Sequence, residues 1–183
     1  MNRLSLLILP LTLSACAATA PDGTDSRPAP ETAVQTAPAR PKTTAEYMTA
    51  QENELRAALT GTPFTLTRHG NILAMMFSGT DVFAENAYQP ASAAQETLKK
   101  IAPVLASYPK TRISVTGRVF GLKPATCRLL SEKRAAAVAD ILKTNAKIAP
   151  VRLWVEGRGD EKTVAGESGV DRVVIVLTPT FVK

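Results

Sequence analysis

The chain has 183 residues, a formal net charge of +6, 45% hydrophobic residues and only 5% aromatic residues. This length allows one domain and a tail, and the composition is typical of a small core of Leu, Val, Ile and Ala. The basic residues are scattered and form no stripe interleaved with aromatic residues, so nucleic-acid binding is not supported. The sequence shows no metal-site spacing, no nucleophile–base pair and no phosphate-binding glycine loop, so we expect no enzyme activity, metal or cofactor.

The N-terminus has the layout of a secretory signal. Arg3 precedes an apolar stretch, residues 4–13, which is too short to span a bilayer because spanning takes roughly 20 residues. Small residues and a cysteine follow, and the string Leu-Ser-Ala-Cys at residues 13–16 resembles the lipobox of bacterial lipoproteins. The alternative is an ordinary signal peptide that ends at a chance cysteine.

The lipobox resemblance implies how the mature protein is anchored. Residues 1–15 would be removed as the signal peptide, and Cys16 would carry a covalent lipid, a diacylglycerol with an added acyl chain such as palmitate. Several acyl chains hold a protein stably, since each buried methylene contributes about 0.8 kcal/mol. Ala17 stands where an Asp often marks inner-membrane retention, so the resemblance favours the outer membrane, with the protein facing the periplasm.

A proline-rich segment separates this anchor from the rest of the chain. Residues 16–43 carry few large apolar side chains and therefore cannot bury enough surface to offset their ordering entropy. We expect an extended tether, which at about 3.1 Å per residue would reach roughly 80 Å at most. Its prolines are Pro21, Pro28, Pro30, Pro38 and Pro41.

The first regular elements are predicted to be a helix and a hairpin. A helix over 44–62 begins with Thr44 as its cap and stops near Gly61. Two short apolar strands, 65–68 and 72–77, flank the turn-like triplet His69-Gly70-Asn71, so we interpret His69 as a turn residue rather than part of a site.

The remaining elements alternate between helices and strands. Apolar residues at spacings of three and four predict two helices, and alternating or continuous apolar runs predict three further strands. The helices are expected at 91–107 and 126–144, and the strands at 112–116, 151–155 and 172–177. The order strand–helix–strand–helix–strand–strand predicts an α/β fold in which both helices pack on one mixed sheet.

Several motifs in residues 46–183 resemble the OmpA-like peptidoglycan-binding domain of small outer-membrane lipoproteins. The most specific is Leu130-Ser131-Glu132-Lys133-Arg134-Ala135, which is similar to that family's Leu-Ser-x-x-Arg-Ala signature. Asp81-Val82-Phe83-Ala84 with Gln89-Pro90, and Gly157-Arg158-Gly159-Asp160, also match the family pattern. The resemblance implies a βαβαββ domain over 63–183, preceded by the helix at 44–62.

The resemblance also implies a ligand. In that family, an arginine of the Leu-Ser-x-x-Arg helix takes the carboxylate of diaminopimelate in the peptidoglycan stem peptide, and a loop aspartate takes its ammonium group. Arg134 stands at the arginine position, and Arg172 retains the second arginine of the family's Asn-Arg-Arg-Val string. The alternative for Arg134 is that it extends to solvent or pairs with an internal carboxylate.

The loop that should supply the aspartate differs from the family pattern. Gly117-Arg118-Val119-Phe120 replaces Gly-His-Thr-Asp, and loss of a charged partner from a desolvated site weakens binding by about 2–5 kcal/mol. Asp171 or Glu161 could substitute from another direction, although the sequence does not place them. We interpret Arg118, Val119 and Phe120 as a candidate contact for a protein partner, the alternative being that Phe120 caps the core.

Two functions therefore follow from the sequence. The first is an outer-membrane lipoprotein that binds peptidoglycan non-covalently, and the alternative is a protein-binding subunit of an envelope or secretion-system complex that no longer binds the wall. If Cys16 is lipidated, Cys127 has no partner in the chain for a disulfide, and a buried, inert thiol is the expected state rather than a reactive one.

Overall fold

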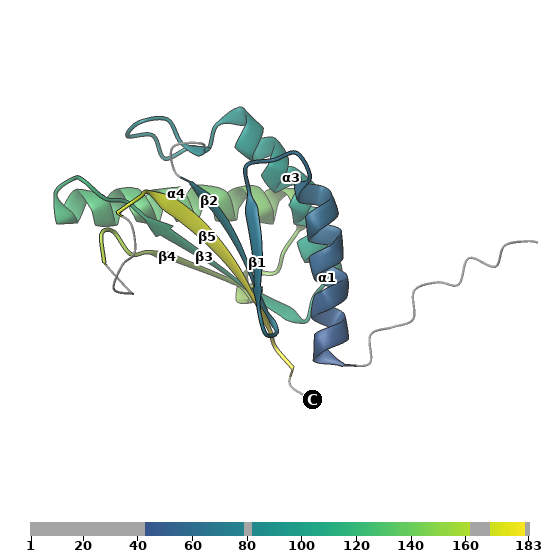
Figure 1. The fold of residues 1–183 in the computed structure, drawn as a ribbon. Coiled ribbons are helices and arrows are strands. Elements are labelled where there is room, and N and C mark those ends of the chain that lie inside the picture. The colour runs from purple at the N-terminus through teal and green to yellow at the C-terminus, as the bar shows by residue number, and fades with distance from the viewer. Residues whose placement is uncertain (1–42, 79–81, 162–168, 182–183) are drawn as a thin grey trace, which may run out of the picture. The chain divides into compact units, whose positions relative to one another are not determined.

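The computed structural model describes residues 43–78, 82–161 and 169–181. They form a mixed five-stranded sheet with three helices packed against it (Figure 1). The predicted signal peptide at 1–15, Cys16 and nearly all of the tether lie outside the described residues. The helices are α1 (Thr44–Leu59), α3 (Ser92–Ser107) and α4 (Pro124–Ala146); the strands are β1 (Thr65–His69), β2 (Ile72–Ser78), β3 (Thr111–Arg118), β4 (Leu153–Gly157) and β5 (Arg172–Pro179).

The sheet has the strand order β1-β2-β5-β3-β4. Its β3–β4 pair is parallel, and the other three pairs are antiparallel. Because β5 lies between β2 and β3 and is antiparallel to both, β2 and β3 run in the same direction. Each of the connections through α3 and α4 therefore joins two parallel strands, which confirms the predicted α/β arrangement on one mixed sheet.

The core lies between the sheet and the helices. Alternate residues of β2, β5 and β3 point to this side in register, for example Leu73, Leu177 and Ile113, and all three are fully buried. Helix α1 belongs to the same core, since its Met48 and Leu55 are also fully buried in it. The helices therefore cover one face of the sheet, and no described helix covers the other face.

Helix α1 is held by its cap and by ion pairs. Its N-cap is Thr43, one residue before the predicted Thr44, and Thr43 and Glu46 form a reciprocal capping box. Glu52 accepts hydrogen bonds from Arg56 and from Arg68 of β1, and both arginines lower the pKa of this carboxyl. The Arg68–Glu52 contact joins β1 to α1, and Figure 1 shows the two elements next to each other. No described helix combines the length and the apolar character needed to cross a membrane.

A strand was predicted at residues 151–155, and its predicted start was wrong. Pro150–Arg152 form a 3-10 turn, and Val151 is 90% exposed instead of lying on a buried strand face. The reason is Arg152, whose guanidinium turns inward and donates to the carbonyls of Leu105 and Tyr108, where α3 ends. Strand β4 begins only after this turn, at the edge of the sheet.

Helix α4 lies unusually close to β3 and β4. A Cβ atom added at Gly117 would lie 2.2 Å from the main-chain oxygen of Ser131, and one at Gly157 would lie 2.3 Å from the main-chain nitrogen of Glu132. Only glycine allows this approach. The buried Ser131 hydroxyl completes the junction, because it accepts a hydrogen bond of 2.9 Å from the main-chain N–H of Gly159.

We predict that Gly117→Ala destabilises the fold. The added methyl group meets main-chain atoms of α4, so the helix must shift, and the free energy of unfolding should fall by about 1–3 kcal/mol. Gly169→Ala is the control, because its Cβ would meet only the Phe120 ring at an ordinary 3.7 Å. Denaturant titrations of both variants test this, and equal stability of the two would contradict the close approach.

Candidate functional site

A pocket of about 380 Å³ lies beside α4, between the segment before α3 and the loop after β3. Its volume suits a ligand group the size of an amino acid. One cation, Arg134, and two acidic residues, Asp171 and the exposed Glu85, line it together with an apolar wall. The described lining residues are Phe83, Ala84, Glu85, Asn86, Val119, Phe120, Leu122, Leu130, Arg134 and Asp171.

Arg134 is the central polar group of this pocket. It lies on α4 one turn after Leu130, which places it on the inward face of the helix, and it is only 4% exposed. Its Nε donates to the carbonyl of Ala87 at 2.9 Å, and its Nη1 donates to Asp171 Oδ2 at 2.7 Å. The guanidinium also stacks on the Phe83 ring, 4.8 Å from the ring centroid.

The segment before α3 holds the Ala87 carbonyl and the Phe83 ring against Arg134. Phe83 and Pro90 form an isolated antiparallel bridge, and the Ala91 N–H donates to the carbonyl of Val82 at 2.6 Å. These contacts close residues 82–91 into a compact loop against Arg134. The match of Val82-Phe83-Ala84 and Gln89-Pro90 to the family pattern therefore has a structural basis, while Asp81 lies outside the described residues.

Asp171 supplies the carboxylate that the loop after β3 lacks. It directly precedes β5, and its Oδ1 accepts a hydrogen bond of 2.8 Å from the main-chain N–H of Phe120. Asp171 therefore bridges the altered loop and Arg134. The sequence named Asp171 as a substitute but could not place it, because its position depends on the register of β5 beside β3.

The pair leaves groups available to a ligand. Arg134 Nη2 makes no hydrogen bond within the described residues, so it can donate to a carboxylate in the pocket. Each oxygen of Asp171 accepts one described hydrogen bond and has a further lone pair for an ammonium group. An acceptor and a donor of opposite charge, side by side against an apolar wall, fit a zwitterionic amino-acid group on an aliphatic chain.

The other candidate residues are distributed around this pocket. Arg118 and Val119 are buried, and Phe120 is half-buried; of the three, Val119 and Phe120 line the pocket. Leu122, 40% exposed, joins Phe120 in the pocket wall; the sequence analysis did not identify it. Arg172 does not line this pocket, and Glu161 pairs with Arg128 at 3.3 Å instead.

Cys127 and His69 are not among the residues that line the pocket. The Cys127 thiol is fully buried against Val119 and Leu130 and donates to the carbonyl of Leu122 at 3.4 Å, in agreement with a buried thiol. His69 is the last residue of β1, paired with Ile72 across the turn at Gly70. Within 43–78, 82–161 and 169–181, no three His, Cys, Asp or Glu side chains are grouped as metal ligands would be.

Comparison with known sequences places this site within a family. Residues 82–173 match the OmpA family, and this range contains both Arg134 and Asp171. The probable lipoprotein YiaD of Escherichia coli (strain K12) is 31% identical over 140 residues, which cover 73% of this chain. The match covers 64% of that relative's length.

Solved structures show the same fold. A putative MotB-like protein from Desulfovibrio vulgaris superposes with a TM-score of 0.62 at 20% identity, over 74% of this chain and 93% of that one. The cell wall anchor of the type VI secretion system (T6SS) from Pseudomonas aeruginosa superposes with a TM-score of 0.57 at 23% identity, over 70% of this chain and 99% of that one. At these identities the likeness establishes the fold alone.

Proposed function

This chain belongs to the OmpA family, and from that premise we propose that it is an outer-membrane lipoprotein whose domain binds peptidoglycan non-covalently. One observation carries the proposal: the Arg134–Asp171 pair, 2.7 Å apart, on the wall of an open pocket. The proposed role is binding and not catalysis. The protein bridges the membrane and the wall.

The pair supports a diaminopimelate ligand in the stem peptide. Its carboxylate would bind the guanidinium of Arg134, and its ammonium group would bind Asp171, while the aliphatic chain would lie against Phe120 and Leu122. The replaced loop removes the family's aspartate, and Asp171 restores a carboxylate at the same arginine from the other side. The expected weakening of 2–5 kcal/mol for a site without that anion therefore does not apply to this chain.

The sequence features before the domain support the membrane end of the bridge. We propose that Cys16 carries the lipid, that the proline-rich tether crosses part of the periplasm, and that the domain after it holds the wall. The lipoprotein relative and the cell wall anchor among the structural neighbours agree with an envelope protein of this general kind.

A second candidate function rests on the apolar side chains at the pocket rim. Leu122 is 40% exposed and lines the pocket together with the half-buried Phe120 of the altered loop. Accessible apolar side chains at one site favour a protein contact, as in a structural subunit of an envelope or secretion-system complex. This function predicts that the domain binds sacculi no better than an unrelated basic protein does.

We predict that Arg134→Ala abolishes most wall binding. The full chain in mild detergent is incubated with purified sacculi and sedimented, and the retained fraction of the variant should fall at least about ten-fold because the carboxylate loses a charged donor. Arg128→Ala is the matched control, since Arg128 lies on the same helix but is exposed and pairs outside the pocket. Equal retention of wild type and Arg134→Ala would exclude the pocket as the wall site.

We predict that Cys16→Ser releases the protein from the membrane. The serine hydroxyl does not receive the diacylglycerol, so the chain loses the acyl groups that anchor it. Cell fractionation should move the protein from the outer-membrane pellet to the soluble fraction, and labelling with radioactive palmitate should be lost. Cys127→Ser, which alters the other, buried cysteine, should leave labelling unchanged. Continued labelling of Cys16→Ser would refute lipidation at this residue.

A further inference from the structure

The face of the sheet that the described helices leave uncovered carries a second hollow. Residues of β3 and β5 that alternate with the core residues point to this face, among them Ser114, Thr116, Val174 and Val176. They line a shallow hollow of about 430 Å³ together with Thr178 and three arginines. Hydroxyl groups, small apolar groups and guanidinium groups thus share one surface.

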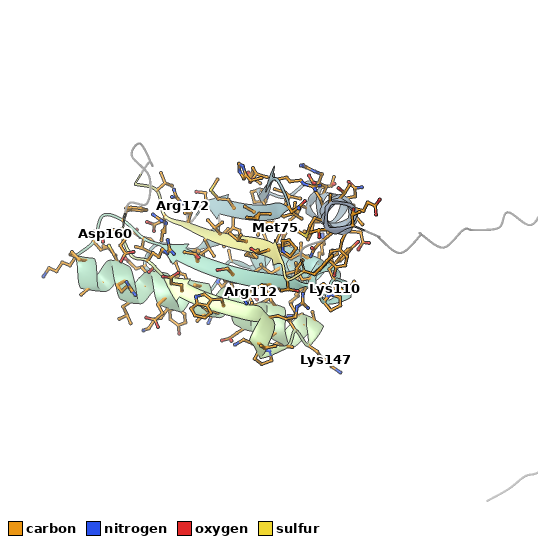
Figure 2. All side chains as sticks on the ribbon, turned by 90° about the horizontal axis from the view of Figure 1, so that it is seen from below. Met75, Lys110, Arg112, Lys147, Asp160 and Arg172 are labelled. Atoms are coloured by element: carbon orange, nitrogen blue, oxygen red, sulfur yellow. The ribbon has the colours of Figure 1, made fainter. Side chains whose placement is uncertain are left out.

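The three arginines lie at one end of this hollow. Arg118 ends β3, Arg172 begins β5, and Arg158 follows β4 directly, so the sheet brings them together from three strands. Figure 2 shows Arg172 and Asp160 at the end of the sheet that is opposite to Lys110. No described carboxylate lines the hollow. The Nε of Arg158 donates to Glu156 at 3.1 Å, and the guanidinium of Arg118 donates to the main-chain carbonyl of Glu161.

This hollow continues around the end of the sheet to the Arg134 pocket. A third hollow of about 330 Å³ lies between these two. It shares Asp171 with the Arg134 pocket, and it shares Arg172 with the hollow on the helix-free face. Asp171 and the next residue, Arg172, which begins β5, therefore connect the two surfaces. A polymer bound at Arg134 can extend over this end of the sheet without leaving the protein.

Trp154 provides an aromatic surface on the same face. It is the only tryptophan in the chain, it is 65% exposed on the edge strand β4, and it lies in the same row as Ser114 and Val176. A large exposed aromatic ring is a suitable surface for stacking a ligand with an apolar face, and sugar rings have such a face.

We infer that the helix-free sheet face is a second binding surface for the wall polymer, which extends from the diaminopimelate pocket across Arg172 to Arg158 and Trp154. The inference rests on the proposed function. The partly exposed guanidinium of Arg158 fits the free carboxylates that peptidoglycan stem peptides carry, and the hydroxyls with Trp154 fit its sugars. Two linked contacts on one polymer raise retention on sacculi without changing the affinity for a single diaminopimelate molecule.

The test compares polymer and monomer binding by the full chain in mild detergent. Arg158→Ala, Trp154→Ala and the double variant are sedimented with purified sacculi, and each is titrated with free diaminopimelate by calorimetry. We expect the double variant to lose about five-fold in retention on sacculi, more at low salt than at high salt, with diaminopimelate affinity within about two-fold of wild type. Lys100→Ala removes one positive charge from the exposed face of α3 and should retain wild-type binding to both.

The outcomes separate the two proposals. Retention of the double variant equal to that of Lys100→Ala overturns the second surface, even where Arg134→Ala fails to bind. Loss of both sacculus and diaminopimelate binding in the double variant also overturns it, because the face would then act through the first pocket. A thermal melt of each variant excludes unfolding as the cause of a loss. If wild type itself does not bind diaminopimelate or sacculi, the proposed function fails first.

Discussion

The close approach of α4 to β3 and β4 determines where the site can form. Gly117 and Gly157 have no side chain between the strands and the helix main chain, and Ser131 joins that junction to the turn at Gly159. Arg134 lies three residues after Ser131 on the same helix, so its position relative to the sheet follows from this contact. The Leu-Ser-x-x-Arg and Gly-x-Gly motifs thus meet at one close helix–strand contact, and the position of the pocket arginine depends on both.

A buried guanidinium needs a partner, and this chain supplies one from outside the loop after β3. Strand β3 ends at Arg118, and the loop after it begins with Val119 and Phe120 and lacks the family's aspartate. Asp171 nevertheless lies 2.7 Å from Arg134 and also accepts a hydrogen bond from the main chain of Phe120. Breaking such a pair by removing one partner leaves a charge without compensation, at a cost of about 3–5 kcal/mol when it is fully buried. The same arrangement that satisfies Arg134 without a ligand offers a cation and an anion to one.

Most of the secondary structure and the pocket arginine were predictable from the sequence, because the patterns that indicate them are local in the chain. Periodicity and turn residues gave the helices and strands to within a few residues, and the motif around Arg134 identified the family and the pocket arginine. Two features were not predictable. Strand β4 starts later than its alternating residues suggest, because Arg152 turns inward to the end of α3. Asp171 reaches Arg134 only because β5 is inserted between β2 and β3, and a pairing over 37 residues leaves no local signal.

The central claim is that Arg134 and Asp171 together recognise a zwitterion, and a pair of ligands tests it directly. Pimelic acid has the same seven-carbon chain and two carboxylates as diaminopimelic acid but lacks both amino groups. Calorimetric titration of the full chain in mild detergent should show diaminopimelate binding at least about ten-fold more tightly, since only its ammonium group engages Asp171. Asp171→Asn should reduce the difference in affinity between diaminopimelate and pimelic acid. Equal affinity for the two acids, or no binding of either, would contradict the account.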